Sequence, residues 1–204
     1  MKIMAEDEEI DPPMWDGTSA LSRIARAHFA LFNQELAEAK RLQEFVESEG
    51  DTEDDDLTHQ SWECETRAAD HAKVVITFAA FAIESHINSY GARRLGERYF
   101  KNHLDKLDTV SKWIIIPRVV AGRRFPKDHN VFDLLTKLFS YRNEIVHPKS
   151  TKIDMAKLEK EAKNRFAMEK KFLEFVPKAI ELLSQLKKVA AELDPKDQIL
   201  RHEL

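Results

Sequence analysis

Residues 130–150, NVFDLLTKLFSYRNEIVHPKS, carry the pattern from which the fold prediction starts. Apolar residues recur there at steps of three and four, namely Val131, Leu134, Leu135, Leu138, Ile145 and Val146. This spacing predicts an amphipathic helix with one buried face. At about 100° per residue, Arg142 falls in the middle of that face. Because a guanidinium keeps its charge, we expect a partner for Arg142 on another helix, another chain or a ligand.

This helix is expected to end at His147, because Pro148 disfavours helical geometry in the residue before it. On a continuous helix the His147 side chain would point roughly 140° away from that of Arg142. At a frayed helix end the imidazole can turn back toward Arg142, or it can face a second copy of these residues across an interface. Arg142, Asn143 and His147 are therefore the candidate catalytic residues.

The order Arg142-Asn143, three further residues and then His147 resembles the RNxxxH form of the HEPN superfamily motif. Residues 107–122, LDTVSKWIIIPRVVAG, also resemble sequences of bacterial HEPN-like families, and the resemblance covers about residues 74–150. It implies a helical bundle. Many HEPN domains are metal-independent endoribonucleases of defence and toxin systems, in which a dimer builds the catalytic cleft. Others have lost catalysis and act as binding modules.

The first half of the chain predicts two long helices. Helical spacing of apolar residues runs from Ser19, a suitable N-cap, to Gly50. His28 lies on this apolar stripe, where an interior or interface histidine is favoured over a functional one. The next helix is expected from about Thr58 to Tyr90, with Gly91 after it. Its run VVITFAAFAI is apolar on every side, which indicates the central helix of a bundle.

The second half predicts shorter helices followed by a long one. Helices are expected at 92–103 and at 107–120, where Pro117 should kink or end the second. Residues 152–193 read as one long helix or two, kinked or split by Pro177. Their heptad seam consists of Phe172, Val176, Ala179, Leu183, Leu186, Ala190 and Leu193. The fold class is therefore all-α, an up-and-down helical bundle with a long C-terminal heptad-patterned helix.

Composition and length indicate one domain. The 204 residues are 43% hydrophobic and 33% charged, with only 5 glycines, as is typical of a soluble helical protein. The bundle is predicted to span 19–193, after a disordered acidic lead at 1–18 and before a loose tail at 194–204. An acidic loop is expected at 50–57. No signal peptide or membrane-length apolar run is present, so we expect a cytoplasmic location and no membrane contact.

The charge is unevenly divided along the chain. Residues 1–66 hold 5 Lys/Arg and 18 Asp/Glu, which leaves 27 and 18 of the totals of 32 and 36 for residues 67–204. The basic remainder suits a polyanion-binding surface, although ordinary solvated faces explain the balance equally well. Residues 118–127 hold four cations and no acid, so a loop near the motif helix is the candidate RNA contact: Arg118, Arg123, Arg124 and Lys127.

Glu84 and Asn88 follow the apolar run VVITFAAFAI and are predicted to support the motif residues. They lie four apart on one helix face, and Glu84 is the expected partner of Arg142. The chain has a single cysteine and no Gly-rich phosphate loop, HExxH or GxSxG, so no metal and no cofactor are expected. Metal-free RNA cleavage needs only a base, an acid and stabilisation of phosphate charge, for which histidine and arginine suffice.

Three interpretations follow from the sequence. The first is a HEPN-type endoribonuclease of a toxin–antitoxin or phage-defence system. It would cleave RNA through attack of the 2′-OH, with His147 as acid or base and Arg142 stabilising the phosphate. Its partners would be RNA, a second copy of the chain, and an antitoxin or another neighbouring-gene protein. The second is a catalytically silent HEPN-like module that binds a protein, nucleotide or RNA. The third is another helical protein, in which Arg142 pairs with Glu84 and His147 only caps a helix.

Overall fold

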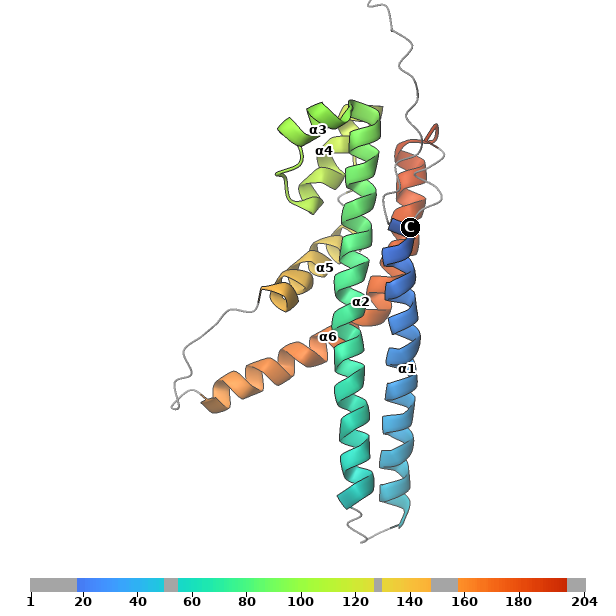
Figure 1. Cartoon of the computed structure of the whole chain (residues 1–204), viewed down its shortest axis with the longest axis vertical. Helices are drawn as coiled ribbons and strands as arrows, with labels where there is room; N and C mark the ends of the chain where they lie inside the picture. The colour runs from blue at the N-terminus through green and yellow to red at the C-terminus, as the bar shows by residue number, and fades with distance from the viewer. Residues whose placement is uncertain (1–17, 50–54, 127–129, 148–157, 198–204) are drawn as a thin grey trace, which may run out of the picture.

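Six α-helices make up the part of the chain that the computed structural model describes, which is residues 18–49, 55–126, 130–147 and 158–197 (Figure 1). No β-strand occurs among these residues, so the predicted all-α fold is confirmed. The helices are α1 (Thr18–Glu49), α2 (Asp55–Leu95), α3 (Glu97–His103), α4 (Thr109–Ala121), α5 (Asn130–Val146) and α6 (Leu158–Leu193). None of the described helices combines the length and apolar composition that a membrane span requires.

Helix α2 is the centre of the bundle. It forms a long antiparallel hairpin with α1, and it also packs against α3, α4, α5 and α6 (Figure 1). Side chains along the predicted central stretch, from Val75 to Ile87, are largely excluded from solvent. One hydrophobic core joins all six helices, with Trp113, Tyr90 and Phe175 among its largest fully buried side chains. The sequence prediction of a buried central helix is therefore confirmed.

The end of α2 differs from the prediction because Gly91 does not stop the helix. A Cβ atom at Gly91 would lie 2.8 Å from Phe100 Cδ2 and 3.0 Å from Ile116 Cδ1, so the residue is needed for close packing. The chain breaks instead at Gly96, whose φ of +85° is open mainly to glycine. The predicted helix over 92–103 is consequently divided between α2 and α3.

Other boundaries are also corrected. Ser19 lies inside the first turn of α1 and is not its N-cap. Asp55 and Asp56 form the first turn of α2, where the helix dipole favours acids, and do not belong to an acidic loop. Residues 50–54 and the lead at 1–17 lie outside the described residues. Pro117 does not end α4. The proline is buried, and the helix continues for one more turn to Ala121.

Helix α6 is continuous through Pro177 and bends near its middle, so that its first half leaves the hairpin and its second half runs alongside it (Figure 1). Every residue of the predicted heptad seam is buried. The residues after α6 are not loose as far as they are described. Asp194, 3% exposed, accepts a hydrogen bond from Tyr90 Oη at 3.0 Å and pairs with Arg94 Nη2 at 3.2 Å. We call Tyr90, Arg94 and Asp194 the latch, because they join the ends of α2 and α6.

Candidate functional site

The motif helix α5 is held against the bundle by its apolar face. Val131, Leu134, Leu135 and Leu138 are buried as predicted. Beyond them the buried position is Tyr141, whose ring meets Phe172 and Phe175 of α6 edge-on at centroid distances of 5.3 Å and 5.1 Å. Ile145 is only half-buried and Val146 is 39% exposed, so the last turn of the helix turns away from the core. Tyr141 therefore fixes the backbone next to Arg142.

The guanidinium of Arg142 is half-buried against α2. Its Cζ lies 5.2 Å above the Phe81 ring, and its Nη2 lies 3.8 Å from Glu84 Oε2. Nη1 donates a hydrogen bond of 3.0 Å to Asn143 Oδ1. Glu84 is thus the carboxylate that faces Arg142, as expected, but 3.8 Å is too long for a hydrogen bond. Nε is buried and has no hydrogen-bond partner among the described residues.

Two adjoining clefts run beside α5. The inner cleft, of about 350 Å³, lies between α2, the start of α4 and α5, and its wall includes Glu84, Asp108 and Arg142. The outer cleft, of about 600 Å³, is lined by Glu144 and His147 together with two residues that it shares with the inner cleft, Ser140 and Asn143. The motif residues therefore line one stepped polar surface, with Arg142 at its inner end and His147 at its outer end.

His147 follows α5 directly and is exposed. Its backbone N–H donates to Asn143 O at 2.9 Å, which closes the last turn of the helix. Within the described residues, no hydrogen bond or ion pair joins the imidazole of His147 to Arg142. The structure thus brings Arg142 and Asn143 into contact, while His147 lies further along the same surface.

The sequence analysis missed residues in and beside the inner cleft, among them Asp108 and Ser140 in its wall and Phe81 against the Arg142 guanidinium. Asp108 caps α4: its Oδ1 accepts from Ser111 N at 2.9 Å and its Oδ2 from Ser111 Oγ at 2.6 Å. The hydrogen bonds from Ser111 lower the pKa of Asp108, which keeps this wall of the cleft negatively charged. The spacing of Asp108 and Ser111 is an N-cap signal that could have located it. Phe81, one turn before Glu84, and Ser140 had no comparable signal.

The other predicted site residues lie elsewhere. Asn88 accepts a hydrogen bond of 2.9 Å from Lys112 Nζ, a side chain only 2% exposed, and lines neither cleft. Arg118, Arg123 and Arg124 are exposed around the C-terminal end of α4, whereas the inner cleft contacts its N-terminal end, about 18 Å away along the helix. Lys127 lies outside the described residues. The structure does not bring Arg118, Arg123 or Arg124 to the clefts.

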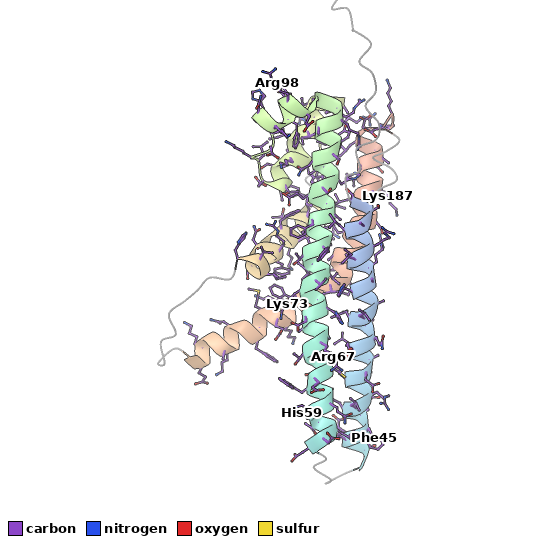
Figure 2. All side chains as sticks on the ribbon, in the orientation of Figure 1. Phe45, His59, Arg67, Lys73, Arg98 and Lys187 are labelled. Atoms are coloured by element: carbon purple, nitrogen blue, oxygen red, sulfur yellow. The ribbon has the colours of Figure 1, made fainter. Side chains whose placement is uncertain are left out.

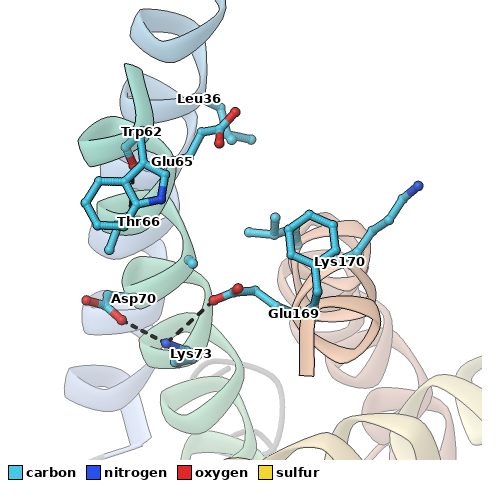
Figure 3. A pocket seen from close by; sticks show the side chains of 11 residues that line it. Leu36, Trp62, Glu65, Thr66, Asp70, Lys73, Glu169 and Lys170 are labelled. Carbon is cyan, nitrogen blue, oxygen red and sulfur yellow. Dashed lines mark hydrogen bonds and ion pairs between the residues drawn. The ribbon is translucent and has the colours of Figure 1, made fainter. Parts of the chain in front are cut away.

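A third hollow, of about 500 Å³, lies between the α1–α2 hairpin and the first half of α6 (Figure 3). Its exposed apolar side chains are Leu36, Trp62 and Phe166. Lys73 reaches across it, 2.9 Å from Asp70 Oδ1 on its own helix and 3.9 Å from Glu169 Oε1 on α6. None of the motif residues lines it, so it does not belong to the candidate site.

His28, on the apolar stripe of α1, is half-buried and meets His71 of α2, with their Nδ1 atoms 3.0 Å apart. Burial, and then the neighbouring His71, lower the pKa of His28. This pair lines none of the three hollows. It therefore joins the two helices of the hairpin, in keeping with the structural role favoured from the sequence.

Comparison with family models, curated proteins and solved structures gave no match to the chain. The similarity to HEPN domains therefore rests on the residues quoted above, and family membership stays a prediction.

Proposed function

We propose that the chain is a metal-independent endoribonuclease of the HEPN type. The observation that carries the proposal is the incompletely paired guanidinium of Arg142 in the wall of a polar cleft. Arginine–carboxylate pairs are frequently bidentate, with two short parallel hydrogen bonds. Among the described residues, Nη2 has only the long contact with Glu84, so it keeps N–H capacity for a phosphate oxygen.

The chemistry needs two proton transfers. The ribose 2′-OH attacks the adjacent phosphorus, its proton goes to a base, and the 5′-oxygen leaves with a proton from an acid. The products are a 2′,3′-cyclic phosphate and a free 5′-OH. Arg142 would stabilise the charge that accumulates on the phosphate oxygens, and His147 would be the base or the acid. Asn143, which holds Nη1 and lines both clefts, would orient the guanidinium.

A second copy of the chain would supply the second proton-transfer group. Each chain offers one histidine in the motif, and His147 is exposed at the open end of the outer cleft, where a partner could approach it. A homodimer in which the C-terminal ends of the two α5 helices face one another would place two histidines beside the backbone of one RNA strand. The resemblance to the HEPN motif also favours a cytoplasmic role in a toxin or phage-defence system. An antitoxin or another neighbouring-gene protein would then be a partner.

A catalytically silent module is the second candidate. The observation that favours it is the fit of Arg142 between Phe81 and Glu84, because this fit gives the arginine a packing role independent of RNA. The silent module would bind its ligand in the same clefts without cleaving it.

The test compares RNA cleavage and thermal unfolding in the wild type and three variants. His147→Ala should reduce cleavage by about 10²-fold or more with little change in melting temperature, because the exposed side chain leaves no cavity. Arg142→Ala should abolish cleavage and also lower stability, since Glu84 and Phe81 lose their partner. Arg142→Lys keeps the charge but loses the fork, so activity should still fall steeply.

His59→Ala is the matched control, because His59 is an exposed histidine near the hairpin tip, at the far end of α2 from the clefts. It should cleave like the wild type. Cleavage should persist in EDTA, and light scattering should give a dimer. The proposal fails if the wild type cleaves no single-stranded or structured RNA between pH 5 and 9, with or without divalent metal. An inactive wild type that Arg142→Ala strongly destabilises would favour the silent module.

A further inference from the structure

The clefts need an RNA-holding surface near them, and the basic residues predicted for this task lie at the opposite end of α4. The segment that reaches the inner cleft is the turn between α3 and α4, which ends at Asp108. A strand of RNA that leaves the inner cleft along this turn would meet α3 next. The surface of α3 is where the strand could be held.

Two aromatic rings cover the exposed side of α3. Tyr99 is 48% exposed, and its ring lies 4.7 Å from that of His103, one helical turn later, at an angle of 48°. Exposed rings of this kind form stacking surfaces for nucleobases, and they tolerate any base because every base has a π-face. Aromatic side chains that are mainly structural are instead buried, as Phe100 of the same short helix is.

The position and charge of α3 fit an RNA strand. His103 is five residues before Asp108, so the two lie within about 18 Å of each other even if the turn were fully extended. Arg98 and Lys106, both exposed, flank the ring pair in sequence and have no carboxylate partner among the described residues. Arg98 projects outward at the end of the molecule remote from His59 and Phe45 (Figure 2). Lys101, in contrast, is paired with Glu97 at 2.7 Å.

We infer that Tyr99 and His103 form a stacking platform for a base of single-stranded RNA whose backbone enters the inner cleft, with Arg98 and Lys106 beside the strand. The inference rests on the proposed ribonuclease function, because the cleft is what makes RNA the ligand. The platform holds substrate and takes no part in proton transfer. Its loss should therefore weaken binding and raise KM while kcat is kept.

The experiment measures binding of a fluorescein-labelled oligouridine by fluorescence anisotropy. The oligonucleotide is fully 2′-O-methylated, because the methyl group blocks the attacking 2′-OH and so prevents cleavage. Tyr99→Ala should raise Kd by about 5- to 150-fold, the range for one lost base–aromatic stack. Tyr99→Phe keeps the ring and should bind like the wild type, and His103→Ala should weaken binding in the same direction. Trp62→Ala removes another exposed ring, far from the clefts on the hairpin, and should change nothing. Circular dichroism melts check that each variant is folded.

The outcomes separate the platform from the nuclease. If Tyr99→Ala binds as tightly as the wild type while the wild type cleaves RNA, the platform is wrong and the proposed function stands. In that case the ring pair only stabilises α3. If the wild type binds the oligonucleotide, Tyr99→Ala weakens binding and no RNA is cleaved, the platform stands and the nuclease is wrong. A wild type that does not bind the oligonucleotide overturns the platform.

Discussion

Tyr90→Phe tests the latch by removing one oxygen atom. Tyr90 is 1% exposed and donates to Asp194 Oδ2 at 3.0 Å, and phenylalanine fills the same space without the hydroxyl. A hydrogen bond to a charged group contributes about 1.5–3 kcal/mol. Arg94 and the backbone N–H of Lys196 still contact Asp194 in the variant, so the loss should be near the lower limit, about 1.5 kcal/mol. For a chain of this size the melting temperature should fall by about 3–6 °C.

The dependence on pH gives a second, independent test. Burial, followed by the hydrogen bond to Asp194, raises the pKa of Tyr90 above its ordinary value of 10. The stability contributed by the neutral hydroxyl is therefore fully present below pH 10 and is lost as the pH rises toward the higher pKa of the folded state. Tyr90→Phe has no such group, so the difference between wild type and variant should be constant from pH 7 to 9 and shrink above pH 10.

Urea unfolding followed by circular dichroism measures both effects. Tyr99→Phe is the control, because Tyr99 is half-exposed and its hydroxyl has no hydrogen bond among the described residues. It should stay within about 0.5 kcal/mol of the wild type. A Tyr90→Phe protein as stable as the wild type at pH 7 would refute the latch. A difference that stays unchanged up to pH 11 would refute the reasoning from the pKa.

Two further predictions concern the core and the hairpin. Gly91→Ala should lower the free energy of unfolding in urea by about 0–2 kcal/mol. Crowding against Phe100 costs about 1–3 kcal/mol, and the better helix propensity of alanine returns about 1 kcal/mol. A higher melting temperature would contradict the close packing. His28 has a pKa below its ordinary 6.5, so its contribution to stability is present above pH 6.5 and is lost as the pH falls toward the folded-state pKa. His28→Phe should therefore lose less stability than the wild type when the pH is lowered from 7.5 to 5.5, and His59→Ala is the control. Parallel curves of unfolding free energy against pH for His28→Phe and the wild type would contradict this.

Periodicity predicted the parts of the fold that depend on one helix at a time. The all-apolar run of α2 and the heptad seam of α6 are buried because a repeated pattern of side chains specifies a face locally. The same reasoning placed Arg142 in the middle of the apolar face, where the structure has it half-buried, and found Glu84 on α2. Both predictions needed only the helical repeat and the cost of burying an unpaired charge.

The features that the sequence did not reveal depend on contacts between distant segments. Gly91 looks like a helix stop until Phe100 and Ile116 are seen to fill the space of a Cβ. Asp194, which follows the last helix, looks like the start of a loose tail until Tyr90 and Arg94 are seen to meet it. Such pairings carry no local signal, because each residue is ordinary in its own segment.

The anchoring of Tyr141 by α6 sets an order of events during synthesis. The motif residues leave the ribosome before Phe172 and Phe175, whose rings hold Tyr141 in place. Helix α5 has 17 residues, and most of the stability of such a helix in a protein comes from tertiary packing of its apolar face. A nascent chain that ends before these two phenylalanines thus carries Arg142 and His147 without the support that shapes the clefts. The clefts can therefore be complete only after Phe172 and Phe175 have been added to the chain.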